Sequence, residues 1–393
     1  MEENAAQPPP PPASSYSPPP PPPVAPPPPL IVPPTGIPPR RGGGGWKVFA
    51  VILLVLLLIS FLFNAGHFFS GLTHTKSGRI SKTVGPKLDE VLTEDNEAQN
   101  KIAVVPIEGI ITSRNMDQGG FNLVEIVKAQ LKSAQEDDKV KAVILKVDSP
   151  GGEVLASDEI YRAISDFQKQ AKKPVIASMG NLAASGGYYV SAPCQWIVAN
   201  ELTITGSIGV IMHSWNYRTL MNKVGLKPET YKSGKFKDML SGERDPEEIP
   251  PEEREMVQKL INETYEKFKG VVADGRKTAH DKNKSNKSKD DQGHALADDW
   301  TDYADGRVLS GKDAQQLGFV DQLGNFEDAV KRAKTIAGIQ SANIIEYQQR
   351  YDLSDIFRLF GKTEAPTIKV DLGMEPPKLK VGQLYFLAPT LAH

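Results

Sequence analysis

The chain has 393 residues and a formal net charge of −2, from 46 basic and 48 acidic side chains. This balance gives no basic excess, so nucleic acid is not an expected partner. The single cysteine, Cys194, cannot form an internal disulfide, and the sequence lacks the Cys/His spacing of structural zinc sites. We therefore expect a domain held together by a packed core, with no cofactor and no metal.

Proline is concentrated at the start of the chain. Of the 32 prolines, 19 lie within the first 40 residues. Proline has no backbone donor and a fixed φ, so such a tract favours solvated polyproline II. We predict a disordered proline-rich tail over residues 1–45, which serves as a spacer or as a dock for a proline-recognising module.

An apolar stretch follows the tail. From Val48 to Phe63 every residue is apolar except Ser60, and flanking aromatic residues extend the stretch toward the roughly 20 residues that a membrane-spanning helix needs. The residues after it match a signal-peptide cleavage site poorly. We predict a transmembrane anchor over residues 46–69 and a linker over 70–100. The basic residues on either side do not settle the orientation of the span.

Strand and helix patterns then alternate. Apolar runs at 102–107, 142–147 and 175–179 predict strands, and residues 123–131 and 154–167 have apolar side chains at helical spacing. Repeated strand–helix–strand units imply parallel strands joined by right-handed crossovers. We therefore predict an α/β domain over residues 101–340.

The second half of the chain is less regular. Apolar residues keep helical spacing beyond Pro251, which predicts a long helix packed on one face. Residues 276–290 are rich in lysine and have almost nothing apolar to bury, so we predict a mobile surface insertion over 276–298. Residues 341–393 form a C-terminal extension. Its stretch 378–387 resembles a strand that we cannot place in the sheet.

Two glycine-rich segments follow predicted strands. Ser149 to Gly152 lies between a strand and a helix, where ligands meet the edge of a parallel sheet. One unit later, Ser185 stands between two alanines and two glycines, so its hydroxyl is unshielded and backbone N–H groups lie near it. This setting suits a nucleophile. It suits a helix N-cap equally well.

A nucleophilic serine needs a base. Of the six histidines only His213 is a plausible one, and it follows an apolar run in which histidine is more often a structural residue. A lysine serves instead if burial removes the water around its charge. Composition alone does not choose among the lysines.

Six segments, in order and spacing, resemble the signal peptide peptidase A family of bacteria. They are DSPGG (148–152), AASGGYY (183–189), TGSIGV (205–210), SGKFKD (233–238), DGRVLSG (305–311) and LGFVDQLG (317–324). The resemblance implies a Clp/crotonase-like fold of repeated βαβ units. It also implies a serine endopeptidase of the short form, in which each subunit carries a full dyad and subunits assemble into a ring or dome.

The same resemblance implies a role for each matching residue. Ser185 would be the nucleophile, Lys237 the general base and Ser207 the residue that orients the lysine. The backbone N–H groups of Gly152 and Gly186 would form the oxyanion hole. Two lysines close to Lys237 in the sequence compete with it for the role of base, and only the family spacing prefers Lys237; they are Lys232 and Lys235.

The resemblance implies a membrane-anchored enzyme with a cytoplasmic tail and an extracytoplasmic catalytic domain, which hydrolyses cleaved signal peptides and other membrane-proximal peptides. Few charges flank the glycine motifs, so we expect extended substrates with small or apolar side chains. The alternatives are a Clp-like peptidase with His213 as base, a crotonase-like enzyme with a coenzyme A site, and an inactive membrane scaffold of the same fold.

Overall fold

The computed structural model describes residues 49–57, 60, 85–114, 120–286, 288–350 and 384–387. The chain divides into two units, Met1–Ile80 and Ser81–His393. In the first unit residues 49–57 are helical and exposed. The predicted tail, most of the predicted anchor and part of the linker lie outside the described residues. Within the described ranges, the model contains no helix with both the length and the apolar character of a membrane span.

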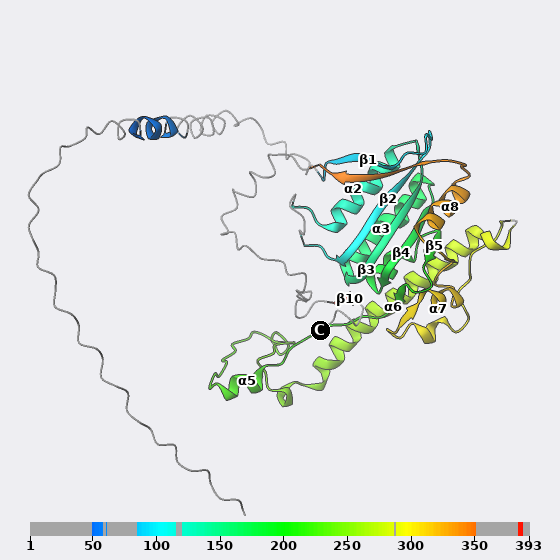
Figure 1. Cartoon of the computed structure of the whole chain (residues 1–393). Coiled ribbons are helices and arrows are strands. Elements are labelled where there is room, and N and C mark those ends of the chain that lie inside the picture. The colour runs from blue at the N-terminus through cyan, green and yellow to red at the C-terminus, as the bar shows by residue number, and fades with distance from the viewer. Residues whose placement is uncertain are drawn as a thin grey trace, which may run out of the picture. The chain divides into compact units, whose positions relative to one another are not determined.

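The second unit alternates strands and helices (Figure 1). In chain order its elements are β1 (Leu88–Glu94), β2 (Lys101–Ile111), α2 (Leu123–Glu136), β3 (Val140–Glu153), α3 (Val154–Ala171), β4 (Val175–Ala184), α4 (Gly186–Ser191), β5 (Trp196–Ala199), β6 (Ile204–Gly206), α5 (Arg218–Lys223), η1 (Pro246–Glu248), α6 (Pro251–Asn283), η2 (Lys289–Asp291), η3 (Trp300–Tyr303), β7 (Val308–Ser310), α7 (Gly311–Gln316), β8 (Gln322–Leu323), α8 (Phe326–Ala337), β9 (Asn343–Gln349) and β10 (Tyr385–Leu387).

One sheet organises this unit. Its strands follow the order β1-β9-β2-β3-β4-β5-β8, and β2 to β5 are mutually parallel. The edge strand β1 pairs antiparallel with β9. Capping boxes start two of the helices, at Asn122 for α2 and at Asn325 for α8. The predicted α/β architecture with parallel central strands is confirmed.

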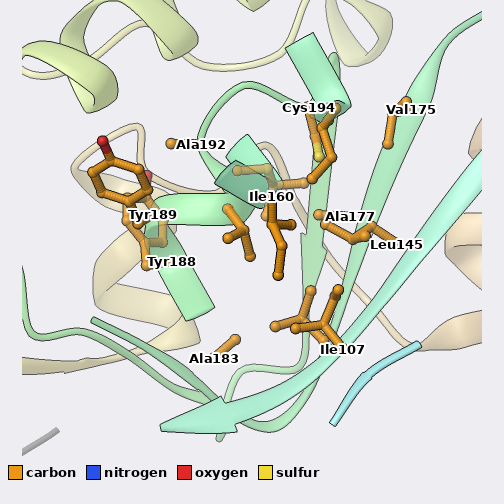
Figure 2. Packing of buried hydrophobic residues seen from close by; sticks show 14 of the residues in the cluster. Ile107, Leu145, Ile160, Val175, Ala177, Ala183, Tyr188, Tyr189, Ala192 and Cys194 are labelled. Carbon is orange, nitrogen blue, oxygen red and sulfur yellow. The ribbon is translucent and has the colours of Figure 1, made fainter. Parts of the chain in front are cut away.

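Helices cover both faces of the sheet. Val143 and Leu145 of β3 belong to the larger core, which includes residues of α2, α3 and α4. Ala142 and Ile144 belong to the smaller core, which includes Ala333 of α8. Neighbouring residues of a strand point to opposite faces, so a strand buried on both faces is a continuous apolar run. Figure 2 shows part of the larger core.

The central strands are longer than the sequence predicts. The predicted strand 142–147 lies within β3, but β3 continues through the glycines to Glu153 because Gly151 and Gly152 pair with β2 across a register shift. The prediction that residues 149–152 lie between the strand and the helix is therefore wrong, because they belong to the strand. Gly151 has a φ of +98°, a conformation that glycine adopts without strain. The strand remains paired while its backbone turns at this glycine.

The predicted surface insertion is also wrong at its start. Helix α6 extends to Asn283, and Arg276 is fully buried. Its guanidinium forms an ion pair with Asp321, whose side chain is equally inaccessible. A charged residue is buried in this way only when a partner compensates it. The partner lies 45 positions along the chain, so a local pattern gives no sign of it.

Candidate active site

Ser185 occupies the turn between β4 and α4. Its backbone has φ 55° and ψ −116°, a left-handed conformation that is strained for a residue with a side chain. The Ser185 N–H donates to Gly206 O at 2.9 Å, and Ser185 O accepts from Tyr189 N at 2.8 Å. Strained strand-to-helix turns of this kind present the serine nucleophile in other hydrolases.

The Ser185 hydroxyl is buried and has no hydrogen-bond partner among the described residues. It makes no capping bond to α4, so the alternative of a serine N-cap is not supported. An unpaired buried hydroxyl costs about 1–3 kcal/mol. A group that is both strained and unpaired is typical of a reactive site.

Three glycine backbones meet beside Ser185. A Cβ added to Gly186 would lie 3.0 Å from Gly151 Cα and 3.1 Å from Gly152 N, and one added to Gly151 would lie 2.5 Å from Gly186 N. Side chains at these positions would collide with backbone. The structure therefore brings together the two residues predicted to supply oxyanion-hole N–H groups, Gly152 and Gly186, next to the predicted nucleophile.

Ser207 lies beside the same turn. Strand β6 pairs parallel with β4 and places Gly206 opposite Ala184, so Ser207 and Ser185 follow as neighbours. Ser207 is buried, has a φ of 50°, and donates its N–H to Arg307 O at 2.7 Å. The predicted lysine-orienting residue, Ser207, thus lies in one cluster with Ser185, Gly152 and Gly186.

Lys237 is outside that cluster. It is exposed, and its amine has no ion pair or hydrogen bond within the described part of the chain. The loop that carries it is attached to the start of α6, where Glu253 accepts from Leu240 N at 3.1 Å. Helix α4, which follows Ser185, contacts α6 at a later point of α6. There the ring of Phe268 in α6 lies 5.0 Å from the ring of Tyr189 in α4. At 1.5 Å per residue, about 22 Å of helix separates Glu253 from Phe268.

The two competing lysines, Lys232 and Lys235, each form an ion pair with a carboxylate. Lys232 Nζ lies 2.8 Å from Asp238 Oδ1, and Lys235 Nζ lies 3.6 Å from Glu252 Oε1. Of the three candidate bases, Lys237 alone has no carboxylate partner in the residues described. The hydrogen bond from Lys232 lowers the pKa of the Asp238 carboxyl.

His213 makes no hydrogen bond to Ser185 among the described residues. It is half-buried, and its Nε2 is without a hydrogen-bond partner in the described ranges. Asp148 accepts the Leu182 N–H at 3.1 Å. This hydrogen bond fixes the chain just before the turn at Ser185.

Strand β10 lies along this site, although its place in the sheet could not be predicted from the sequence. It pairs antiparallel with β3, with Phe386 opposite Gly152 and Leu387 opposite Gly151. A Cβ added to Gly151 would lie 2.0 Å from Phe386 O. The Phe386 ring is 4.8 Å from that of Tyr189 and 4.6 Å from that of Phe268. An extended segment therefore already occupies the edge of β3 at the glycines.

Glu153 is a further residue that the sequence pattern did not single out. Its buried carboxylate accepts from Thr112 Oγ1 at 2.9 Å, from Ser113 N at 2.9 Å and from Ser113 Oγ at 2.6 Å. Burial alone would raise its pKa, but these hydrogen bonds together lower the pKa below its usual value. Glu153 directly follows Gly152, so its hydrogen bonds tie residues 112–113 to the end of β3.

Known proteins resemble this chain. The model of peptidase family S49 matches residues 167–340. "Putative protease slr0021" of Synechocystis sp. is 39% identical over 280 residues, which are 70% of this chain and 89% of that protein. "Putative signal peptide peptidase SppA" of Enterococcus faecium is 36% identical over 67% of this chain and 71% of its own length. "Protease 4" of Salmonella typhi is 34% identical over 65% of this chain and 38% of its own length.

Proposed function

Because this chain belongs to peptidase family S49 and is a serine protease, we propose that it is a membrane-anchored endopeptidase with Ser185 as nucleophile and Lys237 as general base. The observation that carries the proposal is the buried, unpaired Ser185 hydroxyl on a strained turn. The unpaired amine of Lys237 and the family spacing support the choice of base.

The chemistry proceeds in two halves. The neutral Lys237 amine takes the Ser185 proton as Oγ attacks the peptide carbonyl carbon, and the N–H groups of Gly152 and Gly186 bind the oxyanion that forms. The C–N bond breaks as the lysine returns the proton to the leaving amine, which leaves an acyl-enzyme. Water then attacks the ester with the same base, and Ser185 is regenerated. Ser207 directs the lysine throughout.

The base reaches the nucleophile, in this proposal, from a second copy of the chain within a ring or dome. The separation of the Lys237 loop from Ser185 along α6 supports this arrangement, as do exposed apolar side chains in the segment 215–231, which precedes Lys237 in the chain. Trp215 is 72% exposed, Leu220 61% and Tyr231 91%. Exposed apolar groups that gather on one surface mark contact sites. A movement of the loop within one chain is the competing route.

The proposed substrates are cleaved signal peptides and other membrane-proximal peptides in extended form. The edge of β3 supports extended binding, since β10 already pairs there through Gly151 and Gly152. The aromatic contacts of Phe386 support apolar specificity. A substrate must displace β10 before it pairs with these glycines.

We place the enzyme on the membrane, with the proline tail in the cytoplasm and the catalytic domain outside. The apolar run from Val48 to Phe63 supports the anchor by its length and composition. Added protease should reach the catalytic domain of intact spheroplasts and spare the tail. The reverse protection pattern would contradict this orientation.

Cleavage of a synthetic signal peptide tests the activity. The full chain in detergent should cut the peptide at internal bonds, as mass spectrometry of the products reports, and Ser185→Ala should leave it intact. A wild-type chain as inert as Ser185→Ala would favour the inactive scaffold.

A further inference from the structure

The short helix α4 determines where the catalytic groups lie. It begins at Gly186, so Ser185 and the Gly186 N–H both move with it. The bond from Ser185 N to Gly206 O attaches its first end to the sheet. The last carbonyls of a helix have no partners within it, so the other end needs an external attachment.

Helix α6 supplies that attachment through Arg276. Arg276 Nη1 donates to Cys194 O at 2.9 Å and to Ala192 O at 3.4 Å. Ala192 is the C-cap residue of α4, and Figure 2 shows it together with Cys194. The backbones of α6 and of the α4 C-cap also approach closely here: a Cβ added to Gly275 would lie 2.5 Å from Ala192 O, which is too close for a side chain.

The attachment is itself fixed from two sides. Asp321 pairs with the Arg276 guanidinium and accepts the Ile197 N–H at 2.8 Å, which ties the pair to β5. Further along α6, Asn283 makes two hydrogen bonds with Gln195. Gln195 Nε2 donates to Asn283 Oδ1 at 3.1 Å, and Asn283 Nδ2 donates to Gln195 O at 2.9 Å. The segment after α4 is therefore held by buried polar contacts to α6.

We infer that Arg276, paired with Asp321, is a positioning residue for the proposed peptidase reaction, which holds the carboxyl end of α4 so that Ser185 Oγ and the Gly186 N–H keep their places. A buried ion pair contributes less to stability than apolar residues of similar volume often do, and in some proteins it fixes a specific arrangement instead. Arg276 reaches the two carbonyls from Nη1 and the carboxylate from Nη2, whereas a lysine would have to reach all three acceptors from a single nitrogen. This inference rests on the proposed function.

Two variants and one control test the inference in the full chain. Arg276→Lys keeps the charge beside Asp321 and gives up the fork of donors. The double change Arg276→Met with Asp321→Leu removes both charges, which often leaves stability unchanged. Lys259→Met is the control, because the Lys259 side chain lies on α6 but is 78% exposed, and among the described residues it pairs with Glu263 alone.

The readouts separate positioning from folding. We expect both variants to unfold cooperatively above the assay temperature, with kcat lower by about 10- to 100-fold, as for a catalytic group displaced by an ångström, and KM within about twofold of wild type. Labelling of Cys194, the only cysteine in the chain, reports the loosening of its segment. Burial raises the pKa of this thiol to about 12, so labelling should be slow in wild type and in the control and faster in the variants.

A folded Arg276→Lys protein with wild-type kcat overturns the inference. So does a variant whose kcat/KM falls only through a higher KM, or whose activity falls only in proportion to its unfolded fraction. Should the double variant fail to fold, Arg276→Lys decides. Failure of the proposed function looks different: wild type itself would then cleave no better than Ser185→Ala.

Discussion

Phe386 lies opposite Gly152, so the described C-terminal strand covers the edge of β3 that contains a predicted oxyanion-hole residue. Its ring is fully buried against Tyr189 and Phe268. A substrate peptide and β10 cannot pair with the same backbone groups at the same time. The proposed binding of substrates at this edge therefore predicts competition with β10.

Deletion of residues 384–393 should therefore lower KM for an extended apolar peptide and leave kcat nearly unchanged. It should also lower the free energy of unfolding by about 3–5 kcal/mol, because a buried phenylalanine is lost. Deletion of 388–393 alone retains β10 and serves as the control. Steady-state kinetics and urea unfolding give both quantities; an unchanged KM in a folded truncation would contradict the competition.

Changes at Lys237 should abolish activity while a change at a neighbouring lysine should not. Lys237→Ala and Lys237→Arg should lower kcat/KM by about 10²–10⁴-fold, the range that a general base contributes, since arginine does not deprotonate at usable pH. Lys235→Ala is the matched control, because its amine pairs with Glu252 instead. Loss of activity in Lys235→Ala with retention in Lys237→Arg would reassign the base.

Mixed subunits test where the base comes from. Ser185→Ala retains Lys237, and Lys237→Ala retains Ser185, so each single variant lacks half of the dyad. If the dyad forms between copies, co-assembly of the two inactive variants should restore a part of the wild-type rate. A mixture that stays inactive after verified co-assembly would instead support movement of the Lys237 loop within one chain.

The segments around Ser185 could be located in the sequence because each is a short contiguous motif of the family that the chain resembles. Ser185 follows β4 and Ser207 follows β6, and the parallel pairing of these two strands makes the serines neighbours. The distant contacts could not be predicted. Arg276 is in a lysine-rich run typical of solvated surface, and only Asp321 in the folded chain explains its burial. Likewise β10 finds its place through strand β3, more than 200 residues earlier.

Glu153 should make stability depend on pH. Its folded-state pKa is lowered from 4.5, so its contribution is complete above that value and is lost as the pH falls through the folded-state pKa. Glu153→Gln should cost about 1–3 kcal/mol at neutral pH, and the difference from wild type should shrink in acid. Urea unfolding at a series of pH values measures this; a difference that grows in acid would contradict the assignment.

Covalent labelling of Ser185 tests the central claim most directly. The chain is treated with a fluorophosphonate, which reacts with activated serines, and the modified residue is identified by peptide mapping. We predict modification of Ser185 in wild type and in His213→Ala, and little modification in Lys237→Ala or Lys237→Arg. Modification of a different serine, wild-type labelling in folded Lys237→Arg, or loss of labelling in folded His213→Ala would contradict the Ser185–Lys237 assignment.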